Sequence, residues 1–290
     1  MSQNMQLQEP IELMYRNSLP IDGVFHSHAF YEVYYFHTGE CTYLIGDKIM
    51  TLASGDLILM HGMTLHCPNP VPHVPYVRTI IHFDPSYLTT VLQPNKAAEL
   101  LRPFEELSNI RLHLNERDQE EFNRLLTEMN DLYRHRRDPV VHAAYDRFSL
   151  RFMELMHFVG GLCSKHVYER EHRSEKERYV QRVISFLEDH YAEEITLEAI
   201  ASSLHLSKPY LSNLFKEVTG TTVFKYLYNR RINQAKIWLR LKPSYSVSDI
   251  GRMVGFRHLA HFSRLFKAVA GCSPEAYRKG IWQESSSHRE

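Results

Sequence analysis

The chain has few cysteines, no net charge and no long apolar run. Its four cysteines, Cys41, Cys67, Cys163 and Cys272, form no C-x-x-C pair, which argues against a zinc finger and against a disulfide framework. No stretch approaches the roughly 18 apolar residues of a membrane span, and the amino terminus lacks a basic flank followed by an apolar run. These absences predict a soluble cytoplasmic protein, and its 290 residues suffice for two domains with cores.

The neutral total hides an uneven distribution of charge. Residues 200–280 contain 14 Lys or Arg against three Asp or Glu, whereas the rest of the chain contains 20 basic and 31 acidic residues. A compact basic segment is one of the features of a nucleic-acid binder, because its cations neutralise phosphates. A merely solvated helical surface would look the same, so charge alone leaves both interpretations open.

The basic segment contains an internal repeat. Residues 211–220 return as residues 262–271, shifted by 51 positions, and the residues upstream of each copy also match, with a shift of 50. Such a repeat is typical of a duplicated supersecondary unit. Each copy predicts a short helix, a turn and a second helix, which gives helix-turn-helix units over 196–220 and 246–271.

Capping residues and apolar spacing support these helices. Thr196 and Ser207 are suited to cap the two helices of the first unit, Ser246 the first helix of the second unit, and Gly220 is suited to end a helix. Apolar residues recur at i, i+3, i+4 and i+7 along both outer helices. We therefore expect this apolar stripe to be core rather than a platform for stacking bases.

The opposite face of each outer helix is polar. The second helix of such a unit enters the major groove, where its first side chains meet base edges and flanking cations meet phosphates. Arg264 is suited to guanine O6 and N7, and Asn213 to adenine N6 and N7. The predicted DNA-binding residues are Ser207, Lys208, Pro209, Ser212, Asn213, Lys216, Arg257, His258, Leu259, Ala260, Ser263, Arg264 and Lys267.

A long helix is predicted between the two units. Residues 222–241 are rich in helix formers and end before Pro243. At about 1.5 Å per residue such a helix spans roughly 30 Å. This length is close to the roughly 34 Å between successive major-groove faces of B-DNA. One monomer could therefore place both outer helices on one side of a duplex.

At these residues the chain resembles the AraC/XylS family of bacterial transcription regulators. The signature comprises Gly255-Phe256, residues 262–267, Gly271, Ser273-Pro274 and Tyr277-Arg278. The resemblance covers roughly residues 176–280 and departs at His261, where the family usually has Tyr. It implies two helix-turn-helix subdomains joined by a long helix, promoter binding, usually activation, and contact with RNA polymerase. Base contacts differ within the family, so they carry over only as positions.

The first 110 residues follow a different pattern. Short runs such as Glu32–Phe36 and Asp56–Met60 are separated by turn residues, and Gly46-Asp47 is a hairpin signal. This pattern predicts a small β-barrel or sandwich. His26, His28 and Glu32, followed by His66, resemble the two cupin motifs, so we expect a cupin-like barrel.

The same residues are the candidate effector site. If residues 26–36 form one strand, then His26, His28, Glu32 and Tyr34 share a face, and His66 could complete the set. Imidazole and carboxylate ligands suit Zn, Mn, Fe or Ni. Many sugar-sensing regulators keep such residues without a metal. We therefore expect these five residues to bind an effector and expect no cofactor, while metal ligation by His26, His28, Glu32 and His66 stays open.

The overall expectation is an α+β multidomain protein with no catalytic residues. Residues 111–165 show helical spacing, with Pro139 as a break, and could pack on the barrel and present a dimer seam. The predicted parts are a cupin-like effector domain (1–110), this helical segment (111–165), a linker (166–175) and an all-helical DNA-binding domain (176–285).

The predicted function is that of a sequence-specific transcription regulator. We expect an activator that binds double-stranded promoter DNA as a homodimer, responds to a small effector such as a sugar, and has no membrane partner. Two alternatives stay open. A metal-dependent cupin enzyme would use His26, His28, Glu32 and His66 but would leave the basic repeat without a purpose. An effector-independent DNA-binding regulator would leave the barrel without a ligand.

Overall fold

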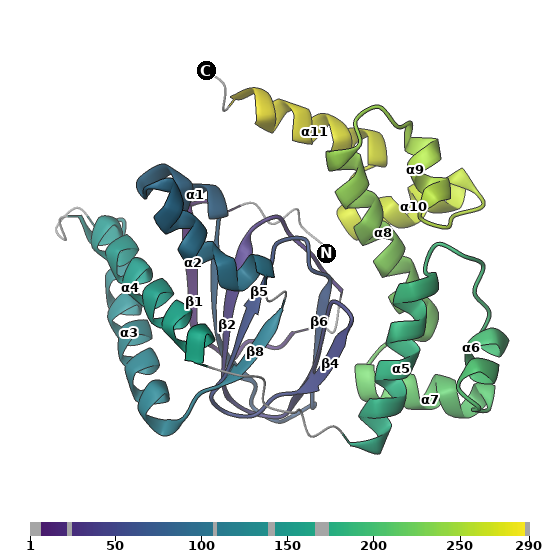
Figure 1. Cartoon of the computed structure of the whole chain (residues 1–290), viewed down its shortest axis with the longest axis horizontal. Helices are drawn as coiled ribbons and strands as arrows, with labels where there is room; N and C mark the ends of the chain where they lie inside the picture. The colour runs from purple at the N-terminus through teal and green to yellow at the C-terminus, as the bar shows by residue number, and fades with distance from the viewer. Residues whose placement is uncertain (1–6, 22–24, 107–108, 139–142, 166–173, 288–290) are drawn as a thin grey trace.

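The fold was obtained as a computed structural model that describes residues 7–21, 25–106, 109–138, 143–165 and 174–287. A barrel occupies the centre, with one group of helices on one side and the carboxy-terminal helices on the other (Figure 1). Among the described residues, none of the helices combines the length and apolarity that a bilayer span requires.

The described strands form two antiparallel sheets. The large sheet has the order β1-β7-β2-β5-β8 and the small sheet the order β4-β3-β6. The strands are β1 (Ile11–Asn17), β2 (Tyr31–Thr38), β3 (Cys41–Ile45), β4 (Lys48–Thr51), β5 (Asp56–Met60), β6 (His66–Pro70), β7 (Val77–Phe83) and β8 (Ile110–His113). The hairpin predicted at Gly46-Asp47 joins β3 to β4, with Gly46 at a φ of 57°.

Alternation along the strands gives both sheets two apolar faces. In β2, Tyr34 faces the barrel interior, whereas Tyr35 faces outward. In β3, Tyr43 faces the interior, whereas Leu44 faces outward. Because each outer face is apolar as well, each sheet must be covered by further elements, and the two sheets are covered by different parts of the chain.

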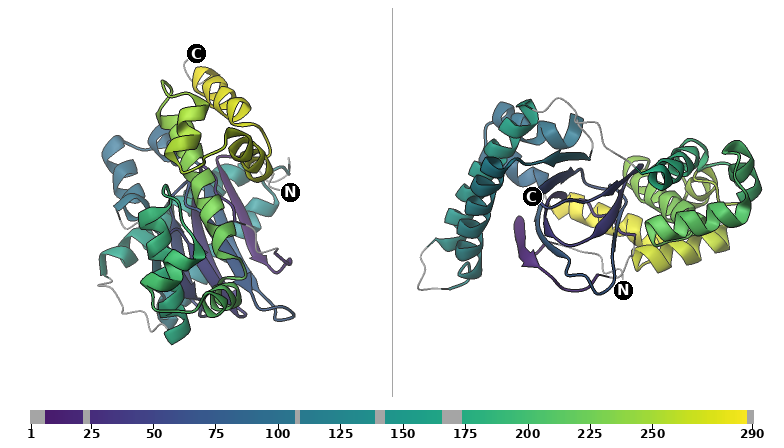
Figure 2. Two further views of the ribbon diagram at one scale, coloured as in Figure 1. Left: turned by 90° about the vertical axis from the view of Figure 1, so that its right-hand side faces the viewer. Right: turned by 90° about the horizontal axis from the view of Figure 1, so that it is seen from below.

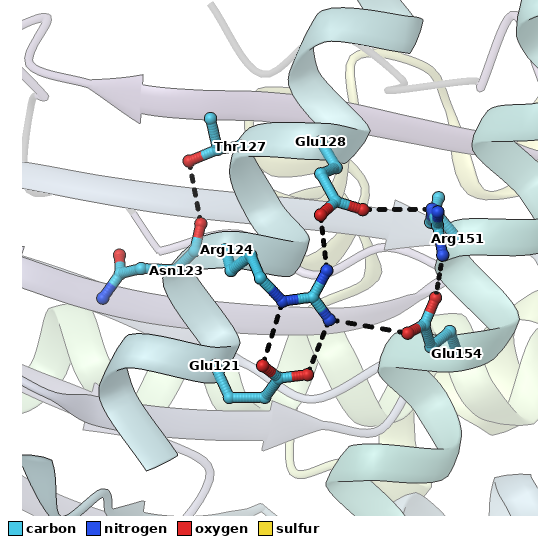
Figure 3. A network of polar contacts seen from close by, with 7 residues as sticks. All are labelled: Glu121, Asn123, Arg124, Thr127, Glu128, Arg151 and Glu154. Carbon is cyan, nitrogen blue, oxygen red and sulfur yellow. Dashed lines mark hydrogen bonds and ion pairs between the residues drawn. The ribbon is translucent and has the colours of Figure 1, made fainter. Parts of the chain in front are cut away.

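Four helices cover the outer face of the large sheet. They are α1 (Pro85–Val91), α2 (Pro94–Glu106), α3 (Glu116–Arg134) and α4 (Ala144–Lys165). The apolar residues predicted at helical spacing in α3 and α4, among them Phe122 and Phe152, are buried against this sheet. Their outer faces carry an ion-pair network around Arg124 and Arg151 (Figure 3). The predicted break at Pro139 lies outside the described residues.

The carboxy-terminal part is entirely helical. Its helices are α5 (Glu175–His190), α6 (Leu197–Ser203), α7 (Lys208–Thr219), α8 (Val223–Leu241), α9 (Val247–Met253), α10 (Leu259–Ala270) and α11 (Pro274–Ser287). The long helix predicted over 222–241 is α8, and Thr222 caps it. Most of the predicted linker lies outside the described residues, and α5 already begins at Glu175.

The structure confirms the fold class predicted from the sequence, which is a β-rich domain followed by a helical domain with two helix-turn-helix units. One local expectation was wrong. Residues 26–36 are not one strand, because β2 begins at Tyr31 and His26 forms an isolated bridge with His66. The segment before β2 bends, so the faces of His26 and His28 do not follow from alternation along a single strand.

Candidate nucleic-acid interface and barrel pocket

The first helix-turn-helix unit consists of α6 and α7. The Thr196 hydroxyl accepts a hydrogen bond from the Ala199 backbone N–H at the start of α6, and Ser207 caps α7 in the same way. His205 takes a positive φ of 57° in the turn. Gly220 ends α7 with a φ of 71°, where a residue without Cβ is favoured. The predicted caps and stop of this unit are confirmed.

The second unit, α9 and α10, repeats this geometry. Ser246 caps α9, and Gly255 turns the chain with a φ of 93°. His258 stands at the N-cap of α10 but makes no capping bond with its side chain. Phe262 and Phe266 are fully buried, so the interpretation of the apolar stripe as core is confirmed. His261, the departure from the family signature, lies edge-on to Tyr228 and Phe256 and is therefore a packing residue.

The predicted DNA-binding residues lie on the surface of these two units. Eleven of the thirteen are exposed, whereas Ser212 and Ser263 are half-buried. Lys208, Pro209 and Ser212 line a hollow of about 530 Å³ beside the start of α7. Eleven of the thirteen predicted residues are therefore accessible to solvent while the barrel and the helical domain are in contact. Their contacts with bases and phosphates stay predictions.

Two of the predicted cations are engaged in ion pairs. Lys208 pairs with Glu198 of α6, and Arg257 pairs with Glu194 in the loop before α6. All four side chains are largely exposed, so water and salt screen both pairs. Phosphate oxygens can therefore replace the two carboxylates as partners of these cations.

The first unit is docked on the outer face of the small sheet. One hydrophobic cluster includes Phe25 and Leu44 of the barrel together with Leu214, Phe215 and other residues of α5 to α8. Gln181 of α5 accepts a hydrogen bond from the Ile49 N–H (3.1 Å) and donates to the carbonyl of Asp47 (2.5 Å). A large shared core disfavours independent motion of two domains.

Helix α8 also contacts the barrel, and Figure 2 shows it lying lengthwise across that side. Asn233 Nδ2 donates to the carbonyl of Met63 (2.8 Å), and Lys236 Nζ donates to the carbonyl (3.1 Å) and hydroxyl (2.9 Å) oxygens of Ser27. Burial lowers the pKa of Lys236 to about 8. Because Ser27 lies between His26 and His28, α8 touches the segment that carries a candidate pocket residue.

Inside the barrel, three imidazoles point at one buried carboxylate. Glu32 Oε2 lies 3.2 Å from His82 Nε2, 3.3 Å from His28 Nε2 and 3.7 Å from His66 Nε2. Burial tends to raise the pKa of Glu32, but the adjacent imidazoles of His28, His82 and His66 outweigh it and hold that pKa well below its usual value. Burial also lowers the pKa of His66 well below its usual value. A carboxylate therefore faces at least one neutral imidazole.

The hydrogen bonds of Nδ1 in His28 and His66 determine which tautomer each ring adopts. His28 Nδ1 lies 3.0 Å from the carbonyl of Phe30, and His66 Nδ1 lies 2.9 Å from the carbonyl of Thr64. Since a carbonyl only accepts, Nδ1 carries the proton, and a neutral ring then presents a lone pair at Nε2. Both Nε2 atoms are buried and have no hydrogen-bond partner.

The Nε2 lone pairs of His28 and His66 lie beside the Glu32 carboxylate, and all three groups are acceptors. Such a cluster requires a cation or hydrogen-bond donors between its members. Imidazoles whose other nitrogen donates to a carbonyl, together with a carboxylate, are suitable ligands for a divalent transition metal. His28, Glu32 and His82 offer ligand atoms within 4.8 Å of one another, with His66 beside them. The residues present therefore fit such an ion, and they equally fit the hydroxyl groups of a polar ligand.

The structure brings to Glu32 a further histidine, His82, which the sequence-based set did not include. His82 lies directly opposite Glu32 in the pairing of β7 with β2. His26 instead exchanges backbone hydrogen bonds with His66, with the two ring centres 4.0 Å apart. The predicted Tyr34 lies within the barrel core, and its hydroxyl is hydrogen-bonded to that of Tyr76 (2.8 Å).

Two known families match successive parts of the chain. Residues 15–139 match the AraC-like ligand binding domain, and residues 200–280 match a helix-turn-helix domain. The first range covers the end of β1, strands β2 to β8 and α1 to α3, and the second runs from α6 into α11. The matches therefore fall on the barrel and on the duplicated units.

Relatives of known name match over part of their length. The transcriptional activator NphR of Rhodococcus sp is 40% identical over 108 residues, which are 37% of this chain and 31% of that protein. The HTH-type transcriptional activator RhaS of Salmonella arizonae is 34% identical over 110 residues, 38% of this chain and 39% of that protein. The chain thus spans well under half of these relatives.

Among solved structures, the C-terminal domain of AraT, a response regulator from Geobacillus stearothermophilus, is 29% identical. The similarity covers 37% of this chain and 88% of that chain, with a TM-score of 0.35.

Proposed function

Because the chain belongs to the AraC family of transcription regulators, we propose that it is a cytoplasmic DNA-binding transcription activator that responds to a small effector. The observation that carries this proposal is the pair of basic units whose outer helices, α7 and α10, present exposed polar residues. NphR and RhaS are both named as activators. Neither the basic repeat nor the relatives support the alternative of a metal-dependent enzyme.

Binding of the full chain to duplex DNA tests this function. An operator is first selected from a random duplex pool, and its dissociation constant is then measured across a salt series. The logarithm of the association constant should fall linearly with the logarithm of salt concentration, by about 0.9 for each phosphate contacted. The double variant Lys216→Ala, Lys267→Ala should show a shallower slope. Absence of salt-sensitive binding at modest ionic strength contradicts the proposal.

We propose that the effector, a sugar or a similarly polar metabolite, binds at Glu32 and its imidazoles. The match to a ligand binding domain supports a ligand in the barrel, and the unpartnered Nε2 atoms of His28 and His66 support a site at this cluster. Contact between Ser27 and Lys236 gives a route from the cluster to α8. An effector acts only if it favours one arrangement of the domains over another.

A panel of sugars tests the effector site through the thermal shift of the full chain, followed by operator affinity with each compound that binds. Glu32→Gln should abolish the shift and leave operator binding intact. Asp47→Asn, a change on the β3–β4 hairpin, is the control and should keep the shift. An operator affinity that every binding compound leaves unchanged would support the effector-independent alternative.

A divalent transition metal is a second candidate occupant, favoured because the Nε2 atoms of His28 and His66, which have no hydrogen-bond partner, converge on Glu32. His28, Glu32, His66 and His82 would hold it, and it would supply a positive charge for oxygen atoms of the effector. Elemental analysis of the purified full chain should find about one ion per chain. His82→Ala should lose it, whereas His61→Ala, outside the cluster, should keep it. A metal-free chain that still binds effector contradicts this occupant.

We further propose that the chain acts as a homodimer and contacts RNA polymerase. The outer faces of α3 and α4 are the proposed dimer surface, because Leu150 is 69% exposed there, on the same helix as Arg151 of the ion-pair network. Sedimentation of wild-type chain should give dimers at micromolar concentration, and Leu150→Glu should give monomers. Wild-type monomers with and without effector contradict the dimer.

A further inference from the structure

One buried arginine joins the two helix-turn-helix units. Arg231 extends from α8 and is 7% exposed. Its Nε donates to the carbonyl of Tyr191 (2.7 Å) and its Nη2 to the carbonyl of Glu193 (2.7 Å), both in the loop before α6. Its Nη1 donates to the carbonyl of Gly255 (2.8 Å), in the turn between α9 and α10. A single guanidinium thus binds the backbone of the loop that leads into the first unit and of the turn within the second.

The two loops also approach each other closely. A Cβ at Gly255 would lie 2.8 Å from the carbonyl oxygen of Ala192 and 2.9 Å from Cζ of Arg231. Beside this contact, the ion pair of Arg257 with Glu194 crosses the same junction on the surface. The turn of the second unit therefore rests directly on a loop of the first, with the guanidinium between them.

The adjacent arginine shows what is particular about Arg231. Arg230 donates to the carboxylate of Glu188 (2.6 Å), so its contact joins α8 to α5 and does not reach the second unit. The three hydrogen bonds of Arg231 described above instead go to backbone carbonyls, whose positions follow the path of the chain. A planar guanidinium holds several acceptors in one fixed geometry, which the ammonium of Lys cannot do.

We propose that Arg231 is a positioning residue that fixes the distance and rotation between the two recognition helices, so that the protein accepts one spacing between its two half-sites. The proposal rests on the proposed DNA-binding function. Packing of both units on α8 sets their approximate separation along the helix. The three hydrogen bonds of Arg231 join the two loops to each other and so restrict how far the units can tilt apart.

The test compares operators of different spacing. The full wild-type chain first selects an operator from a random duplex pool, and derivatives then receive one or five base pairs between the two half-sites. Five base pairs turn the second half-site by about half a helical turn, so only one unit can engage its site. We expect one inserted base pair to cost the wild type about tenfold in affinity, which corresponds to about 1.4 kcal/mol.

Arg231→Lys should lower affinity for the selected spacing and reduce the penalty for one inserted base pair below about threefold. Its affinity for the five-base-pair duplex should equal that of the wild type, because each unit still binds alone. Gly255→Ala, which disturbs the junction from the second unit, should produce the same change. Arg230→Lys is the matched control and should keep the wild-type spacing profile.

Two results would overturn the inference. A wild-type penalty that persists in Arg231→Lys shows that other contacts fix the spacing, and an equal loss on every duplex shows that Arg231 only supports the fold. Failure of the proposed function is a separate result, since the wild-type chain would then select no operator.

Discussion

The two helix-turn-helix units are near copies in sequence, yet they occupy different environments. The first shares its core with the barrel, so that Phe215 belongs to one cluster with Phe25 and Leu44. The second forms a separate cluster around Phe262 and Phe266, in which all the described members come from α8 to α11 and the turns between them. The same duplicated unit thus packs on the barrel in one copy and has a core of its own in the other.

The largest effect is expected when the equivalent core residue is replaced in each unit. Phe215→Ala and Phe266→Ala are equivalent in the repeat, and each should cost about 3–5 kcal/mol of stability, because both rings are fully buried. Hydrogen exchange should rise in β3, β4 and β6 in Phe215→Ala. In Phe266→Ala it should rise only from α8 onward. Protection of the small sheet that is the same in both variants contradicts a shared core.

Substitutions of base-contacting residues should also distinguish the two units, because each unit should read a different half-site. Asn213 and Arg264 occupy equivalent, exposed positions on α7 and α10. Replacing either with Ala should cost about 1–3 kcal/mol of binding to the selected operator and relax specificity, each at a different half-site. Lys267→Ala should instead weaken all sequences alike and lower the salt slope by about 1. The predicted docking orientation is wrong if Arg264→Ala and Lys267→Ala both bind like the wild type.

The duplicated domain was predictable because its signals are local. Thr196, Ser207 and Ser246 cap helices through hydrogen bonds to residues three positions ahead, and Gly220 meets a steric requirement of its own backbone. The strand assumed over residues 26–36 failed because the alternation of side chains does not reveal where a strand bends.

The pocket was predictable only in part, since long-range pairing completes it. His28 and Glu32 are close in sequence, but His82 reaches Glu32 through the pairing of β7 with β2. Alternation along β7 places His82 on the same face as the barrel residue Ile80, which was the available signal. The contact of Lys236 with Ser27 joins residues 209 positions apart and has no sequence signature.

That contact gives a smaller and more selective prediction. Lys236→Met should leave operator affinity within about threefold of wild type while removing the change that the effector causes, which for coupled sites is about 5- to 150-fold. The reason is that Lys236 binds Ser27 of the barrel, whereas the DNA-binding residues lie elsewhere. Arg240→Met, exposed one turn further along α8, is the control and should keep the effector response. A normal response in Lys236→Met contradicts transmission through α8.

The smallest expected effect concerns a cation of the first unit that is already paired. The Glu198 carboxylate is exposed, and the hydrogen bond from Lys208 lowers its pKa. In Glu198→Gln the ammonium of Lys208 has no anionic competitor and should interact more strongly with phosphate, tightening binding to any duplex by less than about threefold. The gain should shrink as salt rises, because at about 0.1 M salt the screening length is only about 10 Å.

The acid that pairs with a cation of the second unit should behave differently. Glu194 pairs with Arg257 across the junction of the two units, so Glu194→Gln frees one cation but also removes a contact that helps to hold the units together. We therefore expect Glu194→Gln to weaken the preference for one operator spacing, whereas Glu198→Gln should leave that preference unchanged. Affinities of both variants on the wild-type operator and on its derivative with one inserted base pair check this expectation. Identical spacing profiles would show that the surface ion pair adds nothing to the hydrogen bonds of Arg231.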